Sequence, residues 1–313
     1  MRIRDLRAAD APRLLELLRT QFPAEEAVLG TRPEGFARVV HRVFRWDARL
    51  LLGLLRRFGR PVFRFYVAEE DGAVAATTLV TFGKETGYVS MVVVDPAYRH
   101  RGFARGLLEA ARQATVARGK PYLALDVLAT NEPARRLYES LGYRPLRSAT
   151  YYVHDRPADL SRDARTVRGL RAFRKEDAGP LAEVARQEKP AEVEAVLPTT
   201  SREILGSAWA ARVFELAQAA WVIDEGAGPI GWVSASVPLA TEAGHVAAPI
   251  LGPSVAPETA QALVETAGAW CAEHRAPRLT VVVPTENRRG RAAVEAVGFR
   301  NVFPLWTLYR PSA

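Results

Sequence analysis

The spacing of apolar residues changes several times along the first half of the chain, and each spacing predicts an element. Alternation over a few residues is typical of strands, whereas recurrence every three or four residues is typical of helices. The predicted elements are a strand at 3–6, a helix at 7–18, one or two helices within 33–58, strands at 63–68, 73–82 and 88–94, a helix at 104–118, a strand at 122–128, a helix at 133–141 and a strand at 151–154. This order predicts a mixed α/β fold.

Turn signals between these elements indicate how the strands are joined. Glu70, Asp71 and Gly72 separate the second strand from the third, and residues 83–87 separate the third from the fourth. Such short polar connections with glycine suit hairpins, so the sheet should be antiparallel up to residue 94. Residues 155–164 are polar and lack periodicity, as expected of a linker. We therefore predict one domain at 1–156 and another at 165–313.

The second half of the chain repeats the first. Leu170–Asp177 parallels Ile3–Asp10, and Asn287 to Arg300 matches Asn131 to Arg144 at a constant offset of 156 residues. A length of 313 residues fits two domains of about 150 residues each. The sequence therefore predicts a duplicated unit.

Charge and composition narrow the class of protein. The formal net charge of +8 and the pI of about 9.9 would attract phosphates. The arginines are spread along the chain and are not clustered with interleaved aromatics, which disfavours a nucleic-acid partner. Cys271 is the single cysteine, so no intramolecular disulfide or multi-cysteine metal site can form. A charged N-terminus and no long uncharged stretch predict a cytoplasmic protein without a membrane span.

The segment from Val92 to Ala104 has the pattern of a strand that runs through a loop into a helix. The free N–H groups of a first helical turn carry partial positive charge and can hold a diphosphate, and Gly102 lets the backbone approach it. Arginine and histidine in the loop add charge for further phosphates. Without its context the same string could be a plain strand-to-helix turn.

In element order and in these residues the first half resembles the GNAT superfamily of acyl-CoA-dependent N-acyltransferases. The phosphate signature of that family, Q/R-x-x-G-x-G/A, is satisfied by Arg99, Gly102 and Ala104. The resemblance implies two tandem domains, each a mostly antiparallel mixed sheet flanked by helices, with a V-shaped splay for acyl-CoA. The implied acetyl-CoA-binding residues are Val92, Val94, Arg99, His100, Arg101, Gly102, Phe103, Ala104 and Asn131.

A second motif begins at Asn131, which has the pattern of a helix N-cap with Pro133 in the first turn. Tyr138 follows seven residues later, about two helical turns on, so both side chains lie on one face. The resemblance implies that Asn131 contacts the pantetheine arm and that Tyr138 donates a proton to the departing thiolate. A phenol near sulfur can perform this step.

The resemblance implies an N-acetyltransferase in which a small-molecule or peptide amine attacks acetyl-CoA directly, without a metal. Acceptor and oligomeric state stay open. The alternative is a non-catalytic acyl-CoA sensor or interaction scaffold. Candidate bases around the strands are Glu69, Glu70, Glu85 and His100, but water can relay the proton and no base is assigned. The arginine-rich segment 38–57 could be a lid, a membrane-surface helix or a packed helix.

The second copy departs from the first at the chemical positions. The offset of 156 places Pro257 at Arg101, Glu258 at Gly102 and Val294 at Tyr138. The negative charge of a glutamate would repel a diphosphate, and a proline removes a backbone N–H donor. We therefore predict one active site, in residues 1–156, and a structural or groove-forming role for 165–313.

Overall fold

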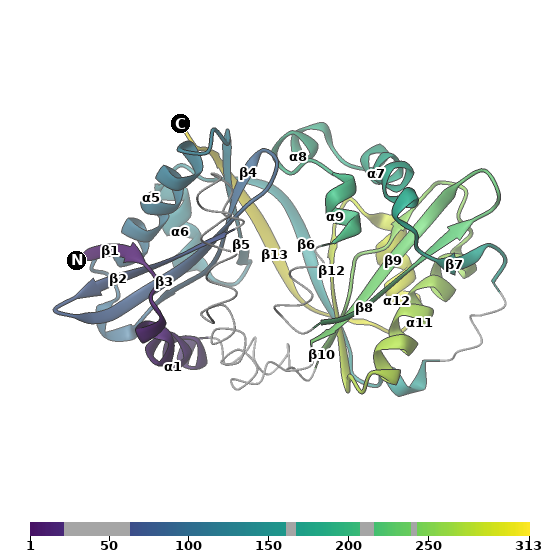
Figure 1. The fold of residues 1–313 in the computed structure, drawn as a ribbon, viewed down its shortest axis with the longest axis horizontal. Coiled ribbons are helices and arrows are strands. Elements are labelled where there is room, and N and C mark those ends of the chain that lie inside the picture. Colours follow the sequence, from purple (N-terminus) through teal and green to yellow (C-terminus); the bar gives the residue numbers. More distant parts are fainter. Residues whose placement is uncertain (22–62, 161–166, 207–215, 239–242) are drawn as a thin grey trace.

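A computed structural model describes residues 1–21, 63–160, 167–206, 216–238 and 243–313. Figure 1 shows two lobes joined by long central strands. The first half of the chain forms β1 (Arg2–Asp5), α1 (Ala11–Gln21), β2 (Phe63–Glu70), β3 (Ala73–Phe82), β4 (Thr86–Val94), α5 (Phe103–Val116), β5 (Tyr122–Leu128), α6 (Glu132–Ser140) and β6 (Arg144–His154). The arginine-rich segment 38–57 lies outside the described residues, so its three interpretations stay open.

The second half of the chain follows the same order of elements. It contains β7 (Leu170–Ala172), α7 (Ala178–Gln187), α8 (Ala191–Val196), α9 (Ser201–Leu205), β8 (Leu216–Asp224), β9 (Pro229–Pro238), β10 (Ala243–Val246), β11 (Ile250–Leu251), α11 (Pro257–Glu273), β12 (Arg278–Pro284), α12 (Arg288–Ala296) and β13 (Arg300–Pro311). The predicted α/β class with flanking helices is therefore confirmed.

The duplication is visible in a matching ion pair at the start of each lobe. Arg4 Nη1 and Nη2 donate to the Asp10 carboxylate at 2.7 and 2.9 Å, and Arg171 donates to Asp177 at 2.8 and 2.7 Å. Each aspartate also accepts a backbone N–H three residues before it. Both pairs fix the turn between the first strand and the first helix, because a bidentate arginine holds its carboxylate in one orientation.

Helices cover both faces of the sheet in each lobe. Alternate residues of β2 face opposite ways, so Val67 packs with Leu17 of α1 while Ala68 packs with Leu107 of α5. In the second lobe, Leu181 of α7 packs on one face and Leu263 of α11 packs on the other. The part of the sheet in each lobe is thus covered on both faces, which explains the long apolar runs in its strands.

The two lobes exchange strands. All thirteen described strands form one sheet, whose order is β1-β2-β3-β4-β5-β13-β6-β12-β10-β9-β8-β7, with β11 paired to β9. Strand β13 lies between β5 and β6, so the last described strand completes the first lobe (Figure 1). Strand β6 lies between β13 and β12 and extends the second lobe in return. Each lobe therefore takes a central strand from the other half of the chain.

The exchange bears on two predictions. The strand expected at 151–154 spans Arg144–His154, because it pairs with β13 from Arg144 to Val153 and with β12 from Ala149 to His154. The domain division at 156 and 165 stays a prediction about where the covalent chain passes between lobes. Neither segment contains all the strands of its own lobe.

Candidate active site

The loop between β4 and α5 has the geometry of an anion cradle. His100 and Gly102 have φ values of 60° and 84°, which turn the chain sharply into the helix. A Cβ at Gly102 would meet no heavy atom within 4 Å, so the backbone conformation favours glycine here, not a lack of space. No side chain caps the first turn of α5. The N–H groups of Phe103, Ala104 and Arg105 lack intrahelical acceptors and can bind a diphosphate.

The other predicted residues of this loop differ in what their side chains contact. Arg101 forms an ion pair with Glu70, and its guanidinium lies 5.3 Å from the Tyr98 ring centroid. The Phe103 side chain is buried in the core of the lobe, so this residue can offer a ligand only its backbone N–H. Arg99 and His100 are exposed at the mouth of the loop. The cradle therefore consists of backbone groups with charged side chains around it.

Strands β4 and β5 diverge beside this loop. They pair in parallel only from Thr86 with Tyr122 to Val89 with Leu125. Met91, with a φ of 56°, lies at a bulge in β4 where the register with β3 shifts. The edge of β4 that contains the predicted residues Val92 and Val94 has no partner on β5. The predicted V-shaped splay is present, and it opens toward the cradle.

Helix α6 places the second motif beside the splay. Asn131 caps the helix, with its Oδ1 accepting the N–H of Ala134 at 3.2 Å, and its side chain is exposed. Tyr138 is 6% exposed and packs in the cluster that contains Val89 and Leu125, the last paired residues before the splay. Burial raises the pKa of Tyr138 to about 12. Its phenol therefore stays protonated at neutral pH.

A group that the sequence analysis missed lies on the opposite face of the same strands. Asp126 follows Leu125 in β5, so its side chain points away from Tyr138. Its Oδ1 accepts the hydroxyl of Thr307, on β13, at 2.7 Å. Thr307 is in turn opposite Arg147 on β6. Strand β5 and the exchanged strands β13 and β6 thus place Asp126, Thr307 and Arg147 in one row on one face.

Tyr88 of β4 completes this group. Burial raises the pKa of the Tyr88 phenol well above its ordinary value, and the nearby Asp126 carboxylate raises it further, whereas Arg147 lowers it. Asp126 could have been noticed as the one acidic residue in an otherwise apolar strand. Thr307 and Arg147 could not, because they reach the site through the strand exchange.

The candidate bases named from sequence are placed elsewhere or remain without a role. Glu69 accepts Arg4 Nε at 2.7 Å, and Glu70 pairs with Arg101. Both lie at the end of β2, which pairs with β1 and β3 and not with β5. These two carboxylates stabilise the edge of the sheet.

Comparison with known proteins agrees with this geometry. Residues 12–143 match the acetyltransferase (GNAT) family, and residues 168–300 match an acetyltransferase (GNAT) domain. The chain belongs to the GNAT family. It is a tandem GNAT protein, since the two matches follow one another and together cover most of its length.

Two solved structures share the fold of this tandem GNAT protein over nearly its full length. One is a tandem GNAT protein from the clavulanic acid biosynthesis pathway, with 17% identity, coverage of 100% of this chain and 98% of that one, and a TM-score of 0.64. The other is a GCN5-related N-acetyltransferase from Sphaerobacter thermophilus, with 18% identity, coverage of 99% and 95%, and a TM-score of 0.68. At these identities the likeness is one of fold.

The second lobe of this GNAT protein differs from the first at the equivalent positions. Helix α11 begins at Pro257, the position that matches Arg101, and Glu258 lies in its first turn. Val294, which replaces Tyr138, is fully buried. Asn287 caps α12 as Asn131 caps α6, but its Nδ2 also donates to the carbonyl oxygen of Pro249 at 2.8 Å. This bond joins the start of α12 to the segment between β10 and β11.

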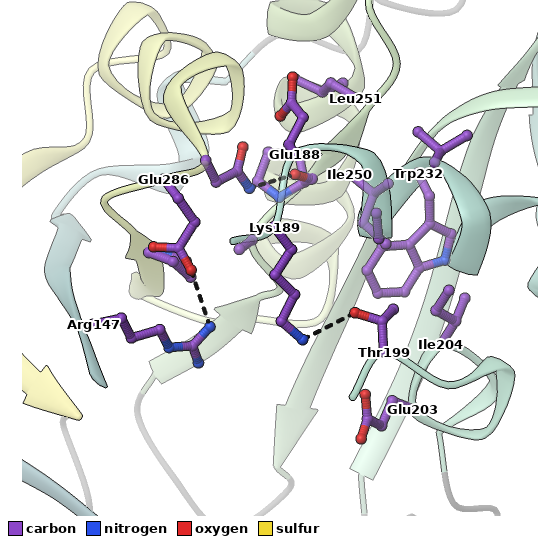
Figure 2. Close-up of a pocket in the computed structure, with 16 residues that line it drawn as sticks. Arg147, Glu188, Lys189, Thr199, Glu203, Ile204, Trp232, Ile250, Leu251 and Glu286 are labelled. Atoms are coloured by element: carbon purple, nitrogen blue, oxygen red, sulfur yellow. Dashed lines mark hydrogen bonds and ion pairs between the residues drawn. The ribbon is translucent and has the colours of Figure 1, made fainter. Parts of the chain in front are cut away.

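Two cavities are lined by Arg147. One, of about 310 Å³, lies in the second lobe, and its lining residues include Trp232, Ile250 and Glu286. Figure 2 shows Arg147 beside Glu286, and Lys189 with its ammonium directed toward Thr199. The other, of about 430 Å³, reaches Tyr88 and Thr81 on the first lobe. Both cavities share Arg147, Lys189 and Glu203, so they adjoin.

No described helix is long and apolar enough to cross a membrane.

Proposed function

We propose that this GNAT protein transfers acetyl from acetyl-CoA to a primary amine by direct attack in a ternary complex, at one active site in the first lobe. The observation that carries the proposal is the alignment of three features. The backbone cradle at Gly102 leads to the unpaired edge of β4, and that edge ends beside Tyr138. A chain-like ligand anchored by phosphates would therefore reach the tyrosine.

The dimensions of the splay suit this arrangement. The N–H groups of Phe103 and Ala104 would hold the diphosphate, with Arg99 adding positive charge and the exposed His100 ring beside it. From Val94 back to Ser90 the strand spans about 13 Å at roughly 3.3 Å per residue. The backbone of Val92 and Val94 along this edge would pair with the amides of a pantetheine arm. The exposed amide of Asn131 could bind the same arm from α6.

Tyr138 is the proposed general acid. The amine nitrogen attacks the thioester carbon, the C–S bond breaks, and the sulfur leaves with the electron pair and takes the phenolic proton. A pKa of about 12 keeps the phenol protonated until the thiolate forms beside it. Because burial causes this shift, Tyr138 is protonated across the whole neutral range.

The second lobe is proposed to shape the acceptor groove and to supply β13, not to catalyse. Glu258 at the helix start would repel a diphosphate, and the Asn287 amide already occupies the backbone carbonyl of Pro249, between β10 and β11. The part of the groove that it would shape is the cavity of about 430 Å³ that reaches Tyr88 on the first lobe.

The test combines binding with turnover. Isothermal titration should detect acetyl-CoA binding to the wild type and none to Gly102→Glu, which places a carboxylate in the cradle. Tyr138→Phe should keep the affinity while thiol release across a broad panel of amines falls by about 10²- to 10⁴-fold. Tyr143→Phe is the matched control, because Tyr143 is a buried neighbour 5.9 Å from Tyr138 whose hydroxyl lacks a hydrogen bond among the described residues.

Two results would count against the proposal. Absence of acetyl-CoA binding to the wild-type protein would remove its basis. Binding without thiol release from any amine would favour the acyl-CoA sensor or scaffold instead.

A further inference from the structure

The row of polar side chains on the face opposite Tyr138 points to the chemistry of the acceptor. Asp126, Thr307 and Arg147 occupy neighbouring positions on β5, β13 and β6. Directly opposed residues of antiparallel strands project from the same face of a sheet. A carboxylate and a guanidinium therefore lie on one surface, two strand spacings or about 10 Å apart at their backbones.

The carboxylate end of the row is at the point of chemistry. Asp126 is the first residue of β5 beyond its pairing with β4, so it lies at the vertex of the splay. Tyr138 lies at the same vertex on the other face, through its contacts with the cluster of Val89 and Leu125. An amine held by Asp126 would thus approach a thioester from the side opposite the proposed acid.

The guanidinium end of the row has donors to spare. Among the described residues, Arg147 makes one polar contact, to Glu286 at 3.5 Å, and its Nε is buried without a hydrogen-bond partner. An arginine has five N–H donors, arranged to match a carboxylate. Arg147 also lines both cavities, so a ligand in either one can reach it.

Among the charged side chains that line the two cavities, Arg147 is the best site for an anion. Lys189, the next cation in the cavities, is already bound to Thr199 at 3.0 Å and to Glu194 at 3.1 Å. Glu203, which lines both cavities, makes no ion pair among the described residues, and burial raises its pKa. A ligand with an amine alone would leave the spare donors of Arg147 unused.

From this arrangement we infer that the acceptor is a short amino carboxylate, such as a free amino acid, with its amine at Asp126 and its carboxylate at Arg147. This inference rests on the proposed acetyl transfer and adds the substrate class. The ammonium gives one proton to Asp126, whose carboxylate the Thr307 hydroxyl supports, and its nitrogen then attacks the thioester carbon. The C–S bond breaks, Tyr138 protonates the departing sulfur, and the nitrogen loses its second proton to solvent to give the amide. Asp126 then releases its proton to solvent, and Tyr138 takes one back from it.

The experiment compares matched pairs of acceptors in an acetyl-CoA-dependent thiol-release assay. Each amino acid is paired with the amine that lacks its carboxylate, for example phenylalanine with phenethylamine and lysine with cadaverine. The wild type should prefer the amino acid. Arg147→Met should raise KM for the amino acid by about 10- to 100-fold, the effect of one charge-assisted contact, and change the amine by less than about threefold.

Further variants separate a binding role from a folding defect. Arg147→Lys should keep part of the preference, and Arg144→Gln, an exposed position on the same strand, should keep all of it. Asp126→Asn should lower kcat for amino acids and amines alike, because it acts on the amine. Acetyl-CoA affinity, measured by titration, should be unchanged in every variant.

Two outcomes would overturn the inference, and they are distinguishable. If amines without a carboxylate are used as well as amino acids, the substrate class is wrong while acetyl transfer stands. If acetyl-CoA binds but neither set releases thiol, the proposed function fails and the inference fails with it.

Discussion

Replacing Leu308 with alanine should test whether the exchanged strand joins the two lobes into one folding unit. Leu308 lies on β13, near the end of the chain, but its side chain is 3% exposed and packs in the first-lobe cluster with Leu108 and Leu123. The change removes three carbons, worth about 2.4 kcal/mol at roughly 0.8 kcal/mol each. A residual cavity brings the expected loss in unfolding free energy to about 3–4 kcal/mol.

The assay is urea unfolding combined with hydrogen exchange followed by mass spectrometry. If the lobes unfold together, Leu308→Ala should lower the protection of peptides from both lobes by the same free energy. Leu263→Ala, fully buried in the second-lobe core on α11, should do the same from the other side. Val116→Ala, at an exposed position, should change stability by less than about 0.5 kcal/mol.

The reasoning would be refuted by a local response. If Leu308→Ala reduced protection only in residues 63–154 while residues 216–296 kept wild-type protection, the lobes would be separate units despite the shared sheet.

Three further outcomes are expected. Gly102→Ala and Gly119→Ala both place a Cβ at a positive φ with no heavy atom within 4 Å. Each should therefore lower the free energy of unfolding by about 1 kcal/mol, measured by thermal unfolding. Titration should show weaker acetyl-CoA binding only for Gly102→Ala. Hydrogen bonds from Arg4 are the main cause that lowers the pKa of Asp10. The stability that the Asp10 carboxylate gives to the fold should therefore be complete above about pH 4 and be lost as pH falls through the lowered pKa. Asp10→Asn should flatten the fall in the urea midpoint below about pH 4. Thr307→Val should reduce kcat severalfold without changing acetyl-CoA affinity, because the Asp126 carboxylate loses a neutral donor.

Local patterns in the sequence predict most of the elements of the fold. The apolar periodicity located the strands and helices of the first lobe, and the glycine and proline positions marked their ends. The cradle could be predicted because it lies within one continuous segment, where Gly102 ends a loop and α5 begins. Tyr138 could be predicted for the same reason, since its spacing from Asn131 is fixed by a single helix.

The pairing of strands that are far apart in the sequence cannot be predicted in the same way. The alternation in β13 shows which of its residues are buried but not which strand lies beside them, and either lobe could have used it. The apolar pattern predicts only residues 151–154 of β6, because Pro145, Arg147 and Ser148 interrupt it. The strand is longer because it pairs on both sides. The row of Asp126, Thr307 and Arg147 depends on that pairing, so the acceptor side of the site could only be found in the structure.

The strand exchange also sets a timetable for biosynthesis. Strand β6 is complete at His154, but β13 does not begin until Arg300, 146 residues later. At 5–20 residues per second the ribosome needs roughly 7–30 s to synthesise the intervening chain. During this interval β5 has no partner on the side that β13 will occupy, and its apolar edge is open to other nascent chains. We therefore expect newly made first lobes to depend on chaperones, and to become competent for catalysis only after the second lobe has been translated.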